Sequence, residues 1–339
     1  MSTPTVTNYS RYLGSHLDPA RPASDYGVMP KRPLGDTGIH VGAIGLGTRS
    51  LSRTGLAAVP DAEILFTLGQ ALDMQASLID VSFADGQGRA LRQLGWAMQG
   101  RRAAAVVSLR VGLDADGGRD DSAAGVRRQV EAALNVLGTD YVDLVFWDRP
   151  AFNDLKDGAP ALQALAALKK EGKLRAWGLN VDEAEAVRAA LEHCGPQVLQ
   201  FPFNVFDQGA AACFADAAAK GVGLVARQPL DSGWLTGRYG IASLFMDGRR
   251  RWGLGVRARR AGLQKAFEQI AMRPNQRAQE AALSFVLSHP EIGCAVAGVS
   301  SWQQVVANVD AARVTLEPGQ VAALKALWTS KIQGRDLPR

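Results

Sequence analysis

Leu78-Ile79-Asp80-Val81-Ser82-Phe83-Ala84-Asp85-Gly86 is the stretch that decides the fold. An apolar run ends in the carboxylate of Asp80 and then opens into a loop that carries a second carboxylate, Asp85. A buried parallel strand brings a polar side chain to the rim of a barrel in this way, because both faces of the strand are covered until it ends. The stretch therefore predicts a barrel strand with candidate site residues at its C-terminal end.

Seven other short apolar segments have the same character, and helical periodicity follows each strand along the chain. The predicted strands are 43–47, 78–80, 104–110, 141–147, 176–179, 198–201, 223–227 and 294–297. The predicted helices are 61–74, 90–98, 121–137, 159–171, 182–193 with Asp182 as its cap, 210–220, 275–288, 302–311 and 319–328. A hairpin is expected over 32–41, and the segment after the seventh strand reads as long and irregular.

Eight strand–helix units within one domain's length predict a (β/α)8 TIM barrel with an N-terminal hairpin and extra C-terminal helices. A doubly wound open sheet is the alternative, but no Gly-x-Gly-x-x-Gly motif follows the first strand. The expected division is an irregular arm at 1–29, one barrel domain at 30–330 and a tail at 331–339. In a barrel the working residues follow the C-terminal ends of the strands, and this rule selects the candidate site.

Composition and charge narrow the function class. The 339 residues are 47% hydrophobic and 21% charged, as in soluble globular proteins. No apolar run reaches spanning length and no signal pattern opens the chain, so a cytoplasmic location without a membrane partner is expected. The cysteines at 194, 213 and 294 lack metal-like spacing and read as reduced packing residues, and no metal site is predicted.

The basic character of the chain is local. The window 249–260 holds six arginines and no acid, and without them the net charge would fall from +5 to −1. A nucleic-acid partner is therefore not expected. The window reads either as a phosphate-holding segment or as solvated surface.

Polar side chains gather at the predicted strand ends, with apolar side chains around them. The candidate catalytic residues are Asp80, Asp85, Arg110 and Asp148, and the candidate substrate-binding residues are Arg49, Phe83, Trp147, Arg227 and Trp234. Carboxylates and arginines near apolar walls perturb one another's protonation and support proton transfer. A plain salt bridge closing the barrel top is the competing interpretation of Asp80 with Arg110. No histidine follows a predicted strand and no lysine ends the third, so acid–base chemistry falls mainly to carboxylates.

Several longer motifs occur in the order typical of one family. They are Arg32-Pro33-Leu34-Gly35-Asp36-Thr37-Gly38, Gly45-Leu46-Gly47-Thr48, Leu137-Gly138-Thr139-Asp140-Tyr141-Val142-Asp143-Leu144, Glu171-Gly172-Lys173-Leu174-Arg175, Pro229-Leu230-Asp231-Ser232-Gly233-Trp234-Leu235-Thr236-Gly237-Arg238-Tyr239 and Ala297-Gly298-Val299-Ser300-Ser301. On these motifs, which extend over roughly residues 31–328, the chain resembles the aldo-keto reductases.

The resemblance implies hydride transfer between a nicotinamide cofactor and a carbonyl, with a tyrosine as proton donor beside a lysine, an aspartate and a histidine. Asp80 matches the aspartate, whereas Asp85, Arg110 and Asp148 stand at the tyrosine, lysine and histidine positions. A carboxyl group is normally ionised near neutral pH, and an arginine cannot lose its proton. The site therefore suits removing a proton better than supplying one.

The same resemblance implies NADP or NAD as cofactor. The residues at the matching positions are Asn180, Gln200, Phe203, Ser301, Gln304 and Asn308. Ser300 stands where a cation often holds the NADP 2′-phosphate. Ser301 with Gln304 also fits a plain capping box that opens a helix.

Three hypotheses follow. The leading one is an enzyme of small-molecule metabolism with a remodelled site, in which Asp85 and Asp148 serve as acid and base and Arg110 as an electrostatic clamp on Asp80. It would dehydrate, isomerise or cyclise a polar or anionic small molecule. The second is an NAD(P)-dependent oxidoreductase with an unusual proton donor. The third is a catalytically inactive barrel that serves as a binding or regulatory subunit, because one fold hosts many functions.

Overall fold

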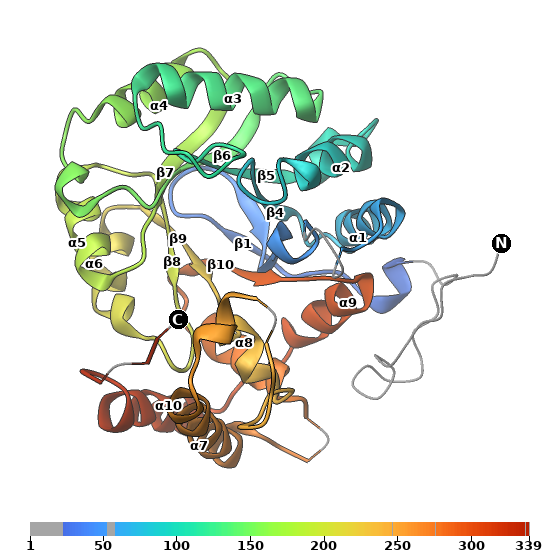
Figure 1. The fold of residues 1–339 in the computed structure, drawn as a ribbon, viewed down its shortest axis with the longest axis vertical. Coiled ribbons are helices and arrows are strands. Elements are labelled where there is room, and N and C mark those ends of the chain that lie inside the picture. The colour runs from blue at the N-terminus through green and yellow to red at the C-terminus, as the bar shows by residue number, and fades with distance from the viewer. Residues whose placement is uncertain (1–22, 53–57, 246, 275, 336, 339) are drawn as a thin grey trace.

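The computed structural model describes residues 23–52, 58–245, 247–274, 276–335 and 337–338. Eight parallel strands close into a barrel in the order β10-β3-β4-β5-β6-β7-β8-β9. Strands β1 and β2 form a separate two-stranded antiparallel sheet. The predicted TIM barrel and its hairpin are confirmed (Figure 1). The strands are β1 Lys31–Pro33, β2 His40–Gly42, β3 Ile44–Gly47, β4 Leu78–Ser82, β5 Val106–Val111, β6 Val142–Asp148, β7 Leu174–Asn180, β8 Val198–Pro202, β9 Gly223–Arg227 and β10 Ile292–Gly298.

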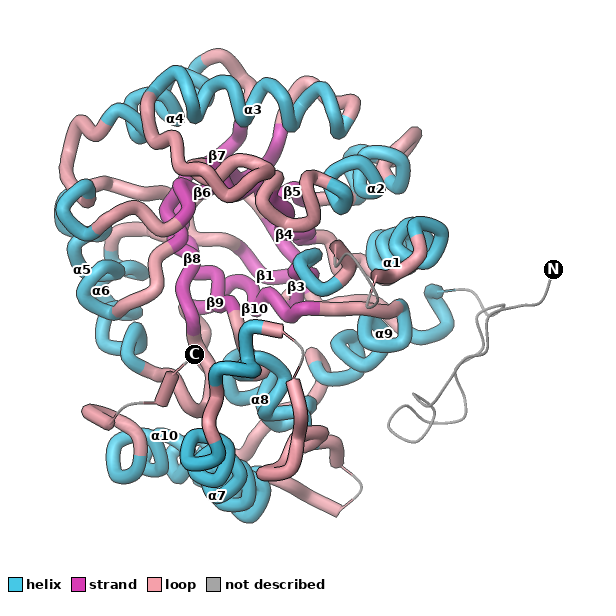
Figure 2. The backbone as a smooth tube through the Cα atoms, viewed as in Figure 1, coloured by secondary structure: helices cyan, strands magenta, loops and turns pink. Residues whose placement is uncertain are grey.

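Helices surround the ring of strands (Figure 2). The α-helices are α1 Asp61–Asp73, α2 Arg89–Ala97, α3 Ala123–Leu137, α4 Pro160–Lys170, α5 Ala184–His193, α6 Phe214–Ala219, α7 Leu254–Ala271, α8 Ala278–Leu287, α9 Trp302–Ala311 and α10 Pro318–Lys331. The shorter 3-10 helices are η1 Ala23–Tyr26, η2 Thr48–Ser50, η4 Arg102–Ala104, η5 Phe152–Asp154, η6 Gly209–Cys213, η7 Asp231–Thr236 and η8 Gly248–Arg251. No helix among the described residues is both long enough and apolar enough to cross a membrane.

Side chains alternate between the barrel interior and the helix layer along each strand. The interior cluster takes Leu78, Val106, Leu144 and Phe146 from the first half of the barrel, and Ala176, Val198, Val225, Cys294 and Val296 from the second. Leu34, Ile39 and Val41 of the hairpin region belong to the same cluster. The hairpin therefore closes the N-terminal end of the barrel and leaves the C-terminal end for a site.

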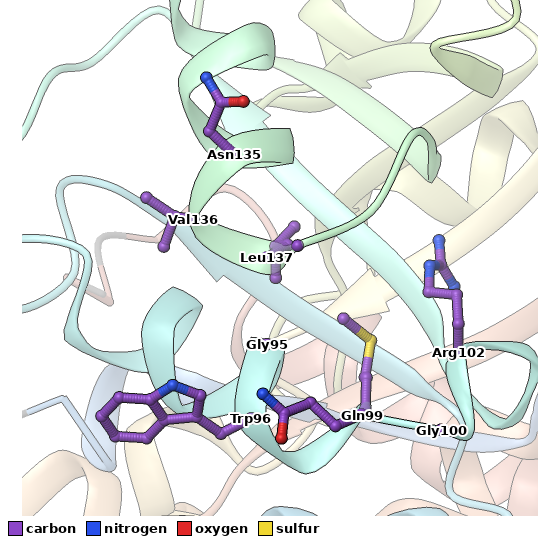
Figure 3. Close-up of a pocket in the computed structure, with 10 residues that line it drawn as sticks. Gly95, Trp96, Gln99, Gly100, Arg102, Asn135, Val136 and Leu137 are labelled. Carbon is purple, nitrogen blue, oxygen red and sulfur yellow. The ribbon is translucent and has the colours of Figure 1, made fainter.

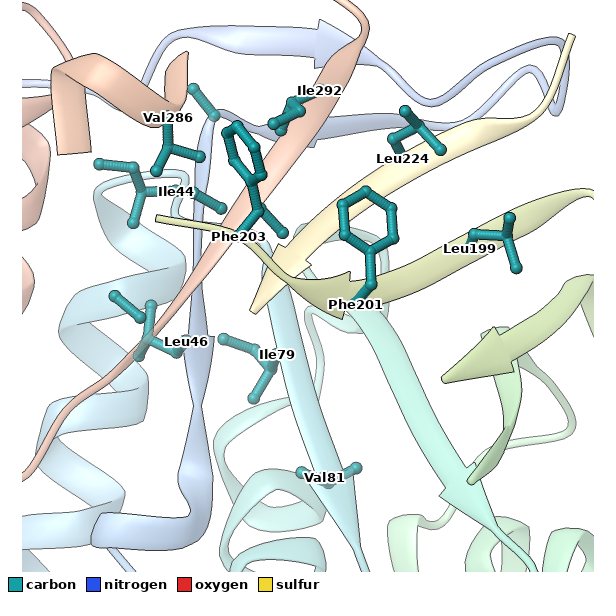
Figure 4. Close-up of a cluster of buried hydrophobic side chains, with 14 of the residues drawn as sticks. Ile44, Leu46, Ile79, Val81, Leu199, Phe201, Phe203, Leu224, Val286 and Ile292 are labelled. Atoms are coloured by element: carbon teal, nitrogen blue, oxygen red, sulfur yellow. The ribbon is translucent and has the colours of Figure 1, made fainter. Parts of the chain in front are cut away.

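The other strand residues pack outward against the helices. Figure 4 shows this layer, in which Phe201 and Phe203 lie with Ile44 and Ile292. Phe203 is fully buried and contacts the rings of Phe214 and Phe285, and His289 lies edge-on to it.

The segment after β9 corrects the sequence prediction, because it contains the 18-residue helix α7. Glycines at 255 and 262 and several arginines hide its apolar pattern, yet Arg260, Leu263, Phe267 and Ala271 are buried at three- and four-residue spacings. Arg260 is fully buried, pairs with Asp231 of η7 and lies 4.2 Å over the Trp252 ring.

Arg249 shows the same structural character as Arg260. It binds the Asp247 carboxylate, donates to the carbonyl of Ser232 at 2.9 Å, and lies over the rings of Tyr239 and Phe245. These two arginines of the 249–260 window therefore hold the fold together, which accounts for them without a bound phosphate.

Two further expectations concern the chain ends and a cap. Most of the predicted arm, residues 1–22, lies outside the described residues, and its described end at Tyr26 packs on Trp302. The predicted cap Asp182 is wrong, because α5 begins after Glu183 and no side chain caps it. Asp182 instead pairs with Arg227 at the barrel mouth.

Candidate active site

The candidate residues come together because they share one strand parity. Asp80, Arg110, Asp148, Asn180 and Gln200 each lie an even number of residues beyond an interior side chain of their own strand. Each therefore points into the barrel at the C-terminal end of its strand, where barrel enzymes carry their sites. The lateral pairing of Asp148 with Asn180 and of Asn180 with Gln200 fixes three of them side by side.

Arg110 is the centre of the site. Its Nε donates to Asp80 Oδ2 at 3.0 Å, its Nη2 donates to Asp85 Oδ2, and its Nη1 lies 3.8 Å from Asp148 Oδ2. One guanidinium fork thus faces three carboxylates, two of which come from different strands and one from the β4–α2 loop. Arginine supplies this geometry because its five donors are fixed in a plane.

Burial and charge act in opposite directions on this cluster. Burial raises the pKa of Asp80, while Arg110 and hydrogen bonds from Ser108 and Gln200 act to lower it. Burial lowers the pKa of Arg110, but Asp80, Asp85 and Asp148 outweigh it and raise that pKa above its ordinary value. Arg110 is therefore a permanent cation, and both carboxylate oxygens of Asp80 accept hydrogen bonds from other strands.

A second chain of contacts holds Asp148. Asn180 Nδ2 donates to Asp148 Oδ1, and Asn180 Oδ1 accepts from Arg227 Nε at 2.8 Å. Arg227 in turn pairs with Asp182. Because both the amide nitrogen and the amide oxygen of Asn180 are hydrogen-bonded, the contacts fix its orientation. Asn180 contacts Oδ1 of Asp148, and the other carboxylate oxygen is Oδ2. That oxygen is buried and accepts no hydrogen bond from any described residue.

Two arginines lie on the solvent side of the carboxylates. Arg49 Nε lies 3.8 Å from Asp85 Oδ1, and its side chain is 87% exposed. Arg149 Nη2 lies 3.5 Å from Asp148 Oδ2, and its side chain is 47% exposed while that of Asp148 is 1% exposed.

Three aromatic side chains that were predicted to bind a ligand are buried in the structure. Trp147 follows an inward-facing Phe146 and therefore points into the helix layer, where its Nε1 donates to Asp121 at 2.7 Å. Trp234 is fully buried among Tyr239, Phe245 and Trp252. Phe203 is enclosed as well, so all three rings are buried, and their roles in binding stay predictions. Phe83 is only partly buried in the loop after β4.

Among the predicted cofactor residues, some side-chain polar atoms are hydrogen-bonded and others are not. Asn180 is engaged by Asp148 and Arg227, and Gln304 by the backbone N–H and hydroxyl of Ser300. Gln200 Oε1, Ser301 Oγ and Asn308 Nδ2 are buried without a hydrogen-bond partner in the described part of the chain. The capping-box interpretation of Ser301 is wrong, because its side chain makes no cap hydrogen bond to α9.

Several residues of the site were missed from the sequence. Ser108 donates to Asp80 Oδ1 at 2.9 Å. It lies two residues before Arg110 on β5 and therefore faces the barrel interior as Arg110 does, and this spacing could have identified it from the sequence. Arg119 donates to the backbone carbonyls of Asp148 and Arg149 at 2.9 and 3.1 Å. Arg119 lies in a loop, so nothing in its spacing pointed to this role.

A separate hollow of about 380 Å³ lies between the C-terminal ends of α2 and α3, lined by Trp96, Gln99 and Val136 among others (Figure 3). Arg102 at its edge is engaged by Asp143 and by two backbone carbonyls. The hollow holds no free acid–base group and lies at the end of the barrel opposite Arg110, so it is not the candidate site.

Comparisons with known proteins agree with the barrel fold. The aldo/keto reductase family model matches residues 43–329. An uncharacterised oxidoreductase of Bacillus subtilis is 24% identical over 88% of this chain and 96% of its own length. The L-galactose dehydrogenase of Arabidopsis thaliana is 26% identical over 83% of this chain and 87% of its own.

Among solved structures, the holo form of an aldo-keto reductase from Bacillus halodurans superposes with a TM-score of 0.76 at 23% identity, covering 91% of this chain and all of that one, which bears on the fold alone. The family match extends over most of the chain. This chain therefore belongs to the aldo/keto reductase family and is an enzyme of that fold.

Proposed function

We propose that this enzyme oxidises a hydroxyl group of a small polar molecule with a nicotinamide cofactor, and that Asp148 is the base. The observation that carries this proposal is Asp148 Oδ2, a buried carboxylate oxygen that accepts no hydrogen bond from the described residues. A buried acceptor without a donor is costly unless a ligand supplies one. A substrate hydroxyl is such a donor.

The direction of the reaction follows from the other residues. Reduction of a carbonyl needs a proton donor, yet the groups facing the mouth are carboxylates and permanently charged arginines. Oxidation needs a proton acceptor, which a carboxylate supplies at neutral pH. Arg110 places a permanent positive charge beside these carboxylates.

The residues present fit a nicotinamide cofactor. Three buried polar atoms have no hydrogen-bond partner among the described residues. They are Oε1 of Gln200 on β8, Oγ of Ser301 just before α9, and Nδ2 of Asn308 within α9. Gln200 would hold the nicotinamide end, and Ser301 and Asn308 the adenosine end. A bound nicotinamide cofactor would supply the hydride acceptor for the oxidation.

The chain's own residues handle the proton and its charge. Asp148 takes the hydroxyl proton on Oδ2 as the carbon–oxygen double bond forms. Asn180 holds Oδ1 of the same carboxylate, so that Oδ2 keeps its direction. Arg110 stabilises negative charge on the substrate oxygen, and its bonds to Asp80 and Asp85 fix its plane. Preorganised donors of this kind cost no rearrangement during the reaction.

The redox proposal replaces the leading hypothesis from the sequence. The comparisons give no support to dehydration, isomerisation or cyclisation, whereas the relatives' names include oxidoreductases and a dehydrogenase. No contact among the described residues specifically supports the hypothesis of a catalytically inactive binding or regulatory subunit.

The test begins with calorimetric titration of the protein with NAD⁺ and NADP⁺. A panel of polyols, sugars and hydroxy acids is then assayed for reduced-cofactor absorbance. We expect micromolar cofactor binding, and turnover that Asp148→Asn lowers by at least about 100-fold with the cofactor affinity unchanged. Failure of both cofactors to bind would refute the proposal and return attention to carboxylate chemistry without hydride transfer.

A further inference from the structure

The arginines of the mouth fall into two classes. Arg110, Arg119 and Arg227 donate hydrogen bonds to carboxylates, a side-chain amide or backbone carbonyls. The side chains of Arg49 and Arg149 donate none to any described residue, although each lies within 4 Å of a carboxylate. Hydrogen bonds within the protein hold the first class in place, and the second class has guanidinium donors available to a ligand.

Arg149 combines a fixed backbone with this available side chain. Its N–H donates to the carbonyl of Asn180 at 2.8 Å, and its own carbonyl accepts from Arg119 at 3.1 Å. Its φ is +49°, in the left-handed region that costs a residue with a side chain about 1 kcal/mol or more. The backbone contacts maintain this conformation, and the Arg149 guanidinium lies beside Asp148.

The charges of the cluster are balanced once Arg49 and Arg149 are counted together with Arg110. Asp80, Asp85 and Asp148 face the single buried cation Arg110, and Arg49 and Arg149 balance the remaining two charges from the solvent side. At 3.5 and 3.8 Å without hydrogen bonds, these outer contacts are looser than an ideal arginine–carboxylate fork. A ligand anion that offers such a fork therefore competes well for them.

We propose that Arg49 and Arg149 bind an anionic group of the substrate, a carboxylate or a phosphate, two or more atoms from the hydroxyl that is oxidised. An anion on Arg149 draws its guanidinium away from Asp148 Oδ2 and so opens the base to the hydroxyl. The substrate class is then a hydroxy acid or a phosphorylated polyol or sugar. This inference rests on the proposed function for the role of Asp148, and on the rim geometry for the anion.

The test uses probes with one carbon skeleton, namely glycerol, glycerate and glycerol 3-phosphate. Their binding in the presence of NAD⁺ is measured by calorimetry, and their oxidation by cofactor absorbance, for the wild type and for Arg49→Gln and Arg149→Gln. Lys170→Gln is the charge-matched control, because Lys170 is exposed in the last turn of α4 at the opposite end of the barrel. Arg149→Lys tests whether charge without the fork suffices.

We expect the wild type to bind an anionic probe at least about 10-fold more tightly than glycerol, and each glutamine variant to weaken that probe by about 10- to 100-fold. Glycerol binding should not weaken in either glutamine variant, and glycerol oxidation by Arg149→Gln should not fall, because the substitution uncovers Asp148 Oδ2. Lys170→Gln should behave as wild type. Comparing carboxylate with phosphate separates the two anion chemistries. Thermal denaturation checks that the variants are folded, as the exposure of both side chains leads us to expect.

The two proposals fail in different ways. Equal affinity for charged and neutral probes, or an anion affinity that both glutamine variants retain, would overturn the anion site even where Asp148-dependent oxidation of a neutral alcohol is found. Anion binding that the variants abolish, without hydride transfer to the cofactor, would uphold the anion site and reject the oxidoreductase mechanism.

Discussion

Replacing Arg110 by methionine tests the electrostatic account of the site most directly. Methionine keeps much of the volume of the side chain but removes the cation that faces Asp80, Asp85 and Asp148. All three carboxylates are less than a tenth exposed, so water cannot take over the role of the arginine. Removing one partner of a buried pair costs about 3–5 kcal/mol, and here the cation that is removed faces three carboxylates. We expect a loss of unfolding free energy at the upper end of that range near pH 7.

The loss should depend on pH with a definite sign. The pKa of Asp80 is already raised by burial, and Arg110 acts to lower it. Without Arg110 that pKa rises further. A carboxyl with a raised pKa in the folded state stabilises the protein below the unfolded pKa, and this stability is lost as the pH rises through the folded pKa. The defect of Arg110→Met should therefore be largest at neutral pH and shrink as the pH falls toward 4.

Urea denaturation followed by tryptophan fluorescence at pH 7 and pH 5 measures both effects. Arg110→Lys is the control, because it keeps the charge while losing the fork, and it should lose less stability than the methionine variant. A methionine variant that loses under about 1 kcal/mol at pH 7, or equal amounts at both pH values, would refute the view that Arg110 neutralises buried carboxylates.

Three further predictions concern single residues. Asp148→Asn should keep the fold and the cofactor affinity but lower kcat by at least about 100-fold, measured by steady-state kinetics on the substrate that the panel identifies. Arg227→Gln should lower kcat about 10-fold with a smaller change in KM, because it frees the Asn180 amide that holds Asp148, and Arg227→Lys should restore part of the loss. Equal damage from both Arg227 variants would argue for a purely structural role. Arg260→Leu should cost about 3–5 kcal/mol in urea denaturation, because it leaves the carboxylate of Asp231 buried without its cation, and an unchanged denaturation midpoint would contradict that pairing.

The fold was predictable because its signal repeats. Each barrel strand is a short apolar run, and the observed bounds differ from the predicted ones by a few residues, with β9 matching at both ends. Helix α7 was missed because glycines and arginines dilute its apolar face and because its buried stripe contains a charged residue, Arg260. A buried arginine looks like surface in the sequence until its partner, Asp231, is known.

The site was predictable to the extent that strand ends and parity define it. Asp80, Arg110 and Asp148 were found because each closes an apolar strand. The same parity rule, applied strictly, would have rejected Trp147, since adjacent strand residues face opposite sides and Asp148 faces inward. The parity rule could not predict the hydrogen bonds of Asn180, because one of them comes from Arg227 on another strand.

The substitutions in the site act as one unit because of charge. With Arg110 beside Asp80 alone, a buried cation would have one partner and several unused donors. Asp85 accepts from the second arm of the guanidinium, and Asp148 faces the third. Conversely, three buried carboxylates without a cation between them would repel one another. Arginine at the end of β5 and aspartates after β4 and at the end of β6 therefore need one another. This mutual dependence is the physical reason to treat the four residues as one unit when the proposed role of Asp148 is tested.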